Sequence, residues 1–549
     1  MSQEKNTRAQ IRLPIILALG ISAGIWIGAT FAEPKNDRND LKSAIYKLQE
    51  IITYINRDYV DSVNTNELVE YGIEKMLNKL DPHSSYITAK DAKLAKSQLE
   101  GEFDGIGIEF GILRDTIYVV SPLTGGPSEK LGILPGDQII KVDGDLVAGK
   151  GVTNRDVFDL LRGPKGSTVE VGIKRRNEDE LLDFSITRDK IPQYSVNASY
   201  MINDEVGYIK ITRFAANTHD EFRKALQSLK NEGMSRLVLD LQGNPGGYMG
   251  AAINIADEIL TDNALIVSQE GKLKRYNQKA YAVRPGAFED GSVIVLINEG
   301  SASASEIVAG ALQDNDRGLI VGRRSFGKGL VQMPIDLSDG AELRLTIARY
   351  FTPSGRSIQK PYGDEDEDEY SRDYLKRLEH GEFFSADSIT FDDSLKYETV
   401  TGRTVYGGGG IMPDFFVPLD TSMTSTYVNR LFGSESWREF ILDYLDKNKK
   451  KYDNMSFEDY YHNYEVSDNM LDELIKVGEK NKVKFIEKDF SKSKKYLKTL
   501  IKAHMARNLY DDNAFYKVIN DINEIYQQAI QLFEEAERLA MRISEEQEE

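Results

Sequence analysis

The chain has 549 residues, a formal net charge of −19 at pH 7 and no cysteine. This length exceeds what one hydrophobic core usually holds and predicts three or four folded units. The acidic balance, without a Lys/Arg cluster, argues against nucleic acid as a partner, and the lack of cysteine excludes disulfides, a thiol nucleophile and cysteine-bound zinc. We expect neither a cofactor nor a metal.

The N-terminus has the pattern of a secretion signal. Arg8 and Arg12 precede an uncharged run from Leu13 to Ala32, and polar residues follow. A basic flank before about 20 apolar residues is typical of a signal peptide or of a membrane-spanning helix. Residues 1–35 are therefore predicted to be a signal peptide or membrane anchor, which places the rest outside the cytoplasm, in the periplasm or cell envelope.

Residues 36–100 are predicted to be a helical domain. Apolar residues recur at three- and four-residue steps from Leu41 to Ile55 and from Leu68 to Leu80. Asp81-Pro82 ends the second helix, because proline disfavours helical geometry in the residue before it. His83 stands beside two serines and invites a catalytic role, but a turn residue that caps local backbone is the favoured interpretation.

Residues 101–190 change to short strands with glycine turns. Gly105-Ile106-Gly107-Ile108 forms a glycine-rich turn before an alternating strand, and a final strand is expected from Val169 to Ile173. This order of signals resembles a PDZ domain. In that family the turn corresponding to Gly105–Ile108 presents N–H groups to a peptide's terminal carboxylate, and the peptide adds as a strand. A small β-rich domain without a ligand is the alternative.

Strands and helices alternate through residues 191–420, which predicts a layered α/β core. The expected strands are Val206–Ile211, Arg236–Leu241, Ser292–Ile297, Leu319–Val321 and Leu330–Ile335, and the expected helices are Thr218–Leu229, Ala251–Leu260 and Glu306–Gln313. The turn Pro245-Gly246-Gly247 follows a buried strand, and its uncovered N–H groups suit a developing oxyanion. An ordinary turn without a function is the alternative.

Residues 300–332 hold three serines spaced by alanines (Ser301, Ser303 and Ser305) and a lysine between two glycines, Lys328. Small neighbours leave a serine hydroxyl uncrowded at a helix start. A lysine must be neutral to act as a base, and burial lowers its ordinary pKa of about 10.4. The hypothesis is a serine nucleophile with a lysine base, and spacing alone does not choose among the serines. Asp314 is not assigned as a base, because a carboxylate nearby would keep the lysine protonated.

A competing motif overlaps this stretch. Gly322 to Lys328 fits the G-x-x-x-x-G-K spacing of a P-loop, but Gly329 stands where Ser or Thr would bind Mg²⁺. A strand is expected next, whereas a P-loop opens a helix. We therefore set nucleotide binding aside.

From about Leu41 to Pro418 the chain resembles the carboxyl-terminal processing peptidases (tail-specific proteases, serine peptidase family S41), which carry an inserted PDZ domain. The motifs that carry this resemblance are Asp81–Tyr86, Asp240–Gly247, Gly300–Ile307, Ser325–Gln332, Thr352–Gln359 and Gly410–Asp414. The resemblance implies a multidomain α/β protein. Its parts would be a crotonase/ClpP-like protease core, an inserted β-rich PDZ domain, an N-terminal helical segment and a helical C-terminal extension.

The same resemblance implies roles for individual residues. Ser303 would be the nucleophile, Lys328 the general base, and Gln332 the residue that orients the lysine amine. The N–H groups of Ala304 and of the Gly246–Gly247 turn would form the oxyanion hole. The implied reaction is endoproteolysis through an acyl-enzyme, on proteins presented by their free C-termini. An inactive PDZ scaffold and a secreted hydrolase of non-peptide acyl groups are the alternatives.

The chain departs from the family pattern in an acidic insertion, about residues 363–404, which begins with the run Asp364 to Glu369. For that run a solvated loop is expected, with selection of basic substrates as the alternative. Residues 421–549 are predicted to be a helical domain ending in one amphipathic helix, with apolar residues from Ile522 to Ile543. Packing on the chain's own core is the favoured interpretation, and self-association or docking of an adaptor is the alternative.

Overall fold

The computed structural model describes residues 35–123, 125–175, 178–363, 370, 372–452 and 454–548. The predicted signal or anchor lies outside the described residues up to position 34, and so does the acidic run 364–369. No helix within the described ranges is long and apolar enough to cross a membrane. The chain divides into two compact units, Met1–Leu77 and Asn78–Glu549.

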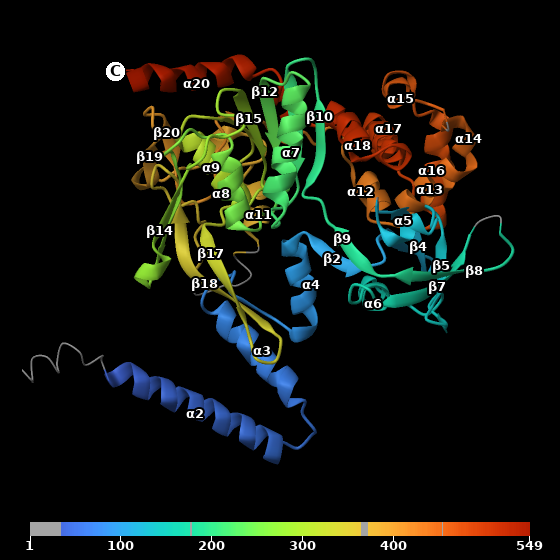
Figure 1. Cartoon of the computed structure of the whole chain (residues 1–549), viewed down its shortest axis with the longest axis horizontal. Coiled ribbons are helices and arrows are strands. Elements are labelled where there is room, and N and C mark those ends of the chain that lie inside the picture. Colours follow the sequence, from blue (N-terminus) through green and yellow to red (C-terminus); the bar gives the residue numbers. More distant parts are fainter. Residues whose placement is uncertain are drawn as a thin grey trace, which may run out of the picture. The chain divides into compact units, whose positions relative to one another are not determined.

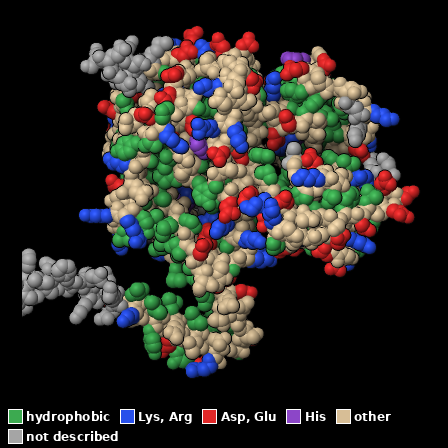
Figure 2. Space-filling model, viewed as in Figure 1, with side chains coloured by type: hydrophobic (Ala, Val, Ile, Leu, Met, Phe, Trp, Pro, Cys, Tyr) green, Lys and Arg blue, Asp and Glu red, His purple; other side chains and the backbone are tan. Residues whose placement is uncertain are grey.

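The described part of the first unit is helical, as predicted. It contains α2 (Lys35–Asp58) and most of α3 (Thr65–Asn78), drawn in blue in Figure 1. Helix α3 ends before Asp81-Pro82, where proline predicts an end. Hydrophobic side chains gather on the surface of these helices (Figure 2); Leu41 and Ile45 of α2 are more than half exposed.

A six-stranded sheet forms the centre of the second unit, in the order β10-β11-β12-β15-β16-β21; Figure 1 labels its strands β10, β12 and β15. Its strands are β10 (Val196–Met201), β11 (Val206–Ile211), β12 (Arg236–Asp240), β15 (Ser292–Ile297), β16 (Leu319–Gly322) and β21 (Phe415–Phe416). Only β10 and β11 pair antiparallel, and the other neighbours are parallel. The predicted layered α/β core is confirmed.

Helices cover both faces of this sheet, because alternate side chains of its buried strands point to opposite faces. Leu237 and Leu239 pack with α7 (Thr218–Asn231), α8 (Met249–Asp257) and α9 (Ala304–Asp314). Val238, between those two leucines, packs with α19 (Glu524–Ala529) and α20 (Phe533–Glu548) on the other face. The C-terminal residues therefore pack on the chain's own core, as favoured. One continuous terminal helix is wrong, because a turn at residues 530–532 separates α19 from α20.

A second, antiparallel sheet lies beside this core in the order β1-β18-β13-β14, with β17 also paired to β18. Its strands are β1 (Ser85–Ile87), β13 (Leu265–Gly271), β14 (Gln278–Tyr281), β17 (Leu330–Asp336) and β18 (Glu342–Phe351), with the short helix η1 (Lys274–Tyr276) between β13 and β14. A strand rather than a helix follows Lys328, so the P-loop geometry is absent at this lysine.

Residues 102–192 form a β-rich domain with a hydrophobic core of its own. Its sheet runs β3 (Ile108–Leu113), β4 (Thr116–Pro122), β5 (Gln138–Val142), β7 (Thr168–Lys174) and β8 (Leu182–Thr187), with β6 (Asp145–Leu146) beside β5 and with helices α5 (Pro127–Lys130) and α6 (Asn154–Leu161). Helix α4 (Ala89–Glu100) leads into β2 (Glu102–Gly105), which pairs antiparallel with β9 (Asp189–Pro192). Val169–Ile173 is not the final strand, since β8 and β9 follow it.

The insertion after the acidic run is ordered. It contains α11 (Asp373–Glu379), η2 (Ala386–Ser388), η3 (Asp393–Leu395) and the hairpin β19 (Lys396–Glu398) and β20 (Thr404–Tyr406). Arg377 and Phe383 are 5% and 1% exposed. The solvated loop was expected for the acidic run 364–369, which lies outside the described residues, whereas side chains of the part after this run pack inside the protein.

The predicted helical C-terminal domain is present. Its elements are α12 (Thr426–Phe432), α13 (Ser436–Lys447), α14 (Lys449–Tyr452), α15 (Phe457–Asn463), α16 (Asp468–Lys480), α17 (Glu487–Leu509), α18 (Asp512–Ile519) and η4 (Asn520–Ile522). Tyr427, Leu474 and Ile501 are fully buried in a core of their own. This domain is therefore a folded unit and not a polar tail.

Candidate active site

Ser303 occupies a strained backbone position at the start of α9. Its φ is +55°, in the left-handed region that side chains with a β-carbon disfavour. Its N–H donates to the carboxylate of Glu306 at 2.7 Å, which holds this conformation. The side chain is half-buried, so a substrate can reach it.

The structure separates the three serines that spacing alone does not. Ser301 and Ser305 are fully buried. Ser301 Oγ donates to the carbonyl of Leu241 at 2.8 Å, and Ser305 Oγ donates to the carbonyl of Asn244 at 2.9 Å. Within the described ranges, the Ser303 hydroxyl donates to no backbone carbonyl and to no side chain. Of the three serines, it is the one whose hydroxyl proton is not held by a buried carbonyl.

The Pro-Gly-Gly turn lies directly against Ser303. A β-carbon added to Gly246 would lie 2.7 Å from Ala302 O and 2.8 Å from Ser303 Cβ, so only glycine allows this approach. The N–H of Gly246 already donates to Asn244 Oδ1 at 2.9 Å. The N–H groups of Gly247 and Ala304 have no acceptor among the described residues. They are the two donors left beside the Ser303 hydroxyl.

Lys328 is half-buried in the loop between β16 and β17. Gly327 precedes it at φ +89°, where an added β-carbon would lie 3.1 Å from Gly410 N and from Lys360 Cβ. The glycine thus lets the loop pack closely. Burial lowers the pKa of Lys328, and the positive charge of Arg344 lowers it further, while Glu306 and Asp81 act in the opposite direction.

Two buried groups join the segments of Ser303 and Lys328. The Glu306 carboxylate accepts from the N–H of Ser303 at 2.7 Å, of Gly327 at 2.7 Å and of Lys328 at 2.9 Å. The hydroxyl of Tyr350, on β18, bonds to the carbonyls of Ser303 and Lys328. Burial raises the pKa of Glu306 to about 7, although its hydrogen-bond donors oppose this rise.

Glu306 is a residue that the sequence analysis missed as part of the site. It appeared there only as the first residue of an expected helix. Its place three residues after Ser303 fits the capping-box spacing S-x-x-E, in which the acid bonds back to the first backbone N–H. That spacing is the signal that could have identified it.

Gln332 lies on β17, close to a cluster of polar side chains. Its amide donates to Leu330 O at 3.3 Å and to Thr346 Oγ1 at 3.4 Å, and the hydroxyl of Thr346 donates to Asp81 Oδ1 at 3.0 Å. These described contacts do not include the Lys328 amine. The orienting role of Gln332 therefore stays a prediction.

His83 lies near the site but does not cap the turn that precedes β1. The Asp81 carboxylate does so, accepting from the N–H groups of His83 and Ser84, both at 2.8 Å. The His83 ring instead bonds to the hydroxyl of Tyr370 at 2.8 Å. Burial and the nearby Lys328 lower the pKa of His83 to about 4, so the imidazole is neutral at neutral pH.

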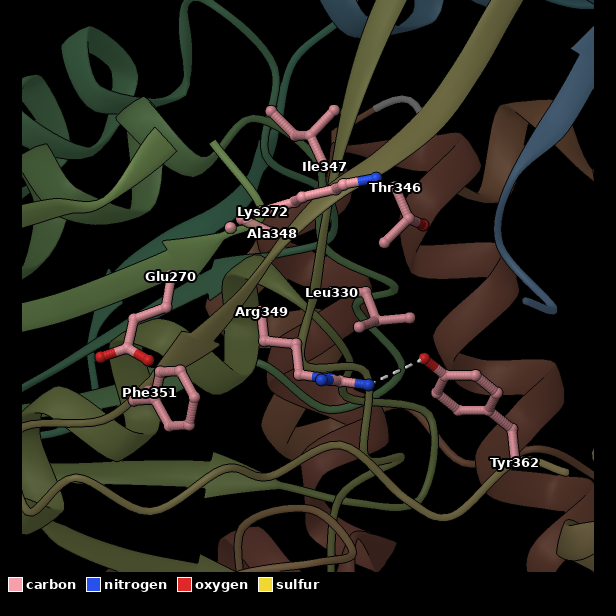
Figure 3. A pocket seen from close by; sticks show the side chains of 10 residues that line it. Glu270, Lys272, Leu330, Thr346, Ile347, Ala348, Arg349, Phe351 and Tyr362 are labelled. Carbon is pink, nitrogen blue, oxygen red and sulfur yellow. Dashed lines mark hydrogen bonds between the residues drawn. The ribbon is translucent and has the colours of Figure 1, made fainter. Parts of the chain in front are cut away.

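A pocket of about 330 Å³ opens beside Leu330, two residues after Lys328, between β13, β17 and β18. Leu330, Thr346, Arg349 and Tyr362 are among its lining residues, and Figure 3 shows the Arg349 guanidinium directed toward the Tyr362 hydroxyl, 3.5 Å away. The pocket leaves space next to the segment that carries Lys328. Among the described side chains, no group of three or more His, Asp or Glu residues could hold a metal ion.

Comparison with known proteins gives the class of this site. Residues 205–367 match peptidase family S41, residues 105–186 match the PDZ domain, and residues 28–91 match the N-terminal domain of the activating protease CtpB. Residues 427–511 match a family of unknown function.

Similar proteins include the carboxy-terminal-processing protease of Bartonella bacilliformis, 38% identical over 355 residues, which cover 64% of this chain and 80% of that protein. The carboxy-terminal processing protease CtpB of Bacillus subtilis is 38% identical over 340 residues, 60% of this chain and 68% of that protein. Among solved structures, the photosystem II D1 C-terminal processing protease shares 33% identity over 57% of this chain and 83% of its own, with a TM-score of 0.33.

The chain belongs to the carboxy-terminal processing proteases of peptidase family S41. It is a serine-type peptidase whose α/β core carries an inserted PDZ domain and helical N- and C-terminal parts.

Proposed function

We propose that this peptidase cleaves peptide bonds with Ser303 as the nucleophile and Lys328 as the general base. One observation carries the proposal. Within the described ranges, Ser303 is the serine of its cluster whose hydroxyl donates to no carbonyl, and Glu306 bonds the backbone of Ser303 and of Lys328 through one carboxylate. An arrangement that fixes these two segments together supports a shared role in the reaction.

The proposed reaction has two steps. Neutral Lys328 takes the proton of Ser303 Oγ as this oxygen bonds to the substrate carbonyl carbon, and the N–H groups of Ala304 and Gly247 donate to the oxyanion. The C–N bond then breaks, and the lysine ammonium returns the proton to the leaving nitrogen. In the second step water attacks the acyl-enzyme, Lys328 accepts its proton, and the Ser303 oxygen leaves and regains a proton. Gln332 would orient the lysine amine.

The electrostatics of Lys328 support a base role. A lysine with an unperturbed pKa of about 10.4 is charged at neutral pH and cannot accept a proton. Burial and Arg344 both lower the pKa of Lys328. The raised pKa of Glu306, about 7, reduces its negative charge near neutral pH and so weakens its opposing effect on the lysine.

We further propose that protein C-termini are presented to this site by the PDZ domain, through the Gly105–Ile108 turn. Gly107 has a φ of +74°, and the N–H groups of Ile106 and Gly107 bond to no acceptor in the described part of the chain. Substrates outside the cytoplasm are proposed from the apolar run Leu13 to Ala32 alone. Fractionation of cells that express the whole chain tests that location.

The dyad is tested by Ser303→Ala and Lys328→Ala, assayed on an unfolded protein substrate. Both variants are expected to melt as the wild type does and to lose at least 100-fold in turnover, because each removes a reacting group. Labelling with a fluorophosphonate probe is a second measurement. In the wild type, the probe should be found on the proteolytic fragment that contains Ser303.

Ser305→Ala is the matched control, because it removes a hydroxyl from the same cluster. It should keep the label, whereas Ser303→Ala should not. Wild-type turnover in Lys328→Ala would exclude the lysine base. A wild-type chain without any turnover or labelling would favour an inactive PDZ scaffold.

A further inference from the structure

Arg377 is a buried cation on α11 of the insertion, 5% exposed. Its guanidinium bonds to the segment at residues 323–329, here called the lysine loop. Nη2 donates to Arg324 O at 2.7 Å, and Nη1 donates to Ser325 O at 3.0 Å. A buried guanidinium needs partners for its N–H groups. Two of these partners are backbone carbonyls of the lysine loop.

A single carboxylate holds this arginine and the loop together. Glu382 accepts from Arg377 Nε at 3.1 Å and from Arg324 Nη2 at 2.5 Å. Both cations and the carboxylate are largely shielded from water. Charge-assisted hydrogen bonds of this kind are directional. The insertion therefore sets the orientation of the lysine loop as well as its distance.

One residue connects these contacts to the proposed dyad. Ser325, whose carbonyl accepts from Arg377, donates its own hydroxyl to Glu306 at 2.5 Å. Glu306 in turn accepts from the N–H of Ser303 and of Lys328. A displacement of Ser325 would therefore move the carboxylate on which both segments depend.

Lys360 forms a second, independent link between the insertion and the lysine loop. Its amine lies 4.1 Å from the ring centre of Phe326, in the loop, and 4.0 Å from that of Tyr370, in the insertion. The amine also pairs with Asp373 of α11 at 3.1 Å. Cation–π contacts strengthen when water is excluded, and Lys360 is only 6% exposed.

We infer that the insertion acts as a brace for the lysine loop, which means that its contacts hold the loop in the position that the proposed dyad requires. Arg377 is the positioning residue. The inference rests on the proposed dyad, because the brace acts through Ser325 and Glu306 on Ser303 and Lys328. It assigns to residues 372–382 a role in the geometry of catalysis.

The test compares Arg377→Met with Arg403→Met in the full chain. Arg403 is a matched control in the same insertion; it bonds Asp316, Asp414 and the carbonyl of Gln313, and it does not contact the lysine loop. Turnover of a labelled unfolded protein is measured across pH, with thermal melting of each variant and with Lys328→Ala in the same series.

Arg377→Met is expected to lower kcat at least tenfold, to change KM less than twofold, and to move the rising limb of the pH profile to higher pH, since a looser loop admits water to Lys328. Arg403→Met should show neither change at equal folded fraction. Wild-type kcat and pH profile in folded Arg377→Met, or identical changes in Arg403→Met, would overturn the inference.

If Arg377→Met does not fold, Glu382→Gln replaces it. This variant keeps the arginine and weakens its anchor, so a smaller change in the same direction supports the brace, and a wild-type profile overturns it. Wild-type turnover of Lys328→Ala is a different failure, because it removes the proposed dyad itself.

Discussion

Charge near Lys328 controls whether its amine can accept a proton. Arg344 and burial lower the pKa of this lysine, and Glu306 and Asp81 oppose them. Arg344 is held on β18 by Glu342, 2.7 Å from its Nε. Its position beside a second cation costs electrostatic energy, and that repulsion favours the neutral lysine.

Arg344→Met should therefore raise the pKa of Lys328. A raised pKa keeps the lysine protonated to higher pH, so activity at neutral pH is expected to fall by roughly threefold and to recover as pH rises. The measurement is the pH dependence of kcat/KM.

Arg349→Met is the control for this prediction, since this change removes a positive charge from the same strand and Arg349, unlike Arg344, is not one of the charges that shift the Lys328 pKa. The prediction fails if the Arg344 variant has the wild-type pH midpoint, or if both variants shift it equally.

The sequence predicted the residue types of the site better than their arrangement. Ser303 could be chosen over Ser301 and Ser305 only by resemblance. The hydroxyl partners of the other two serines lie in the turn after β12, about 60 residues earlier in the chain, and no local pattern reports such contacts. The sequence predicts that His83 lies in a turn. It does not predict that Tyr370 and Lys328 lie near the ring, because both come from distant segments of the chain.

Individual elements were predicted where one local pattern dominated. The strands β11, β12 and β15 are buried and mostly apolar, and α7 has a clear helical period. Strands β13 and β18 were missed because both of their faces are half-buried, so they show no clean alternation. Helices α19 and α20 keep one apolar period across a turn, which made them look continuous.

The edge strand of the PDZ sheet gives a prediction at this scale. Strand β3 pairs with β4 on one side only, and its free edge follows the Gly105–Ile108 turn. A peptide that adds to this edge should place its terminal carboxylate at the turn. A peptide with a free C-terminus is therefore expected to bind at least tenfold more tightly than its C-terminal amide.

Fluorescence anisotropy of the two peptides with the full chain checks this. Ser303→Ala serves as the protein in both titrations, so that cleavage does not consume the probe. Equal affinity for acid and amide would remove carboxylate capture from the proposed function.

At the scale of the molecule, the chain's last helices are part of the catalytic core. Ile525 of α19 is fully buried in the same cluster as Val238 and Ile294 of the central sheet. One face of that sheet would otherwise expose apolar side chains to water. The C-terminal residues are thus needed to complete a layer that begins more than 300 residues earlier.

Ile525→Ala is expected to lower the free energy of unfolding of the core by about 2–5 kcal/mol, because it leaves a cavity under the sheet. Chemical denaturation measured by fluorescence gives this value. Leu146→Ala, at a side chain 50% exposed on β6, is the control and should cost about 1 kcal/mol or less. Similar losses in the two variants would contradict the packing of α19 on the core.

The antiparallel pairing of β2 with β9 sets how the PDZ domain is joined to the protease. The pairs Glu102↔Pro192 and Gly105↔Asp189 hold the chain's exit from the core and its return side by side, about 5 Å apart. For protein engineering, this pair of strands is a suitable insertion point for another domain. A different domain whose ends lie equally close could replace the PDZ domain there, giving the same catalytic core another means of recruiting its substrates.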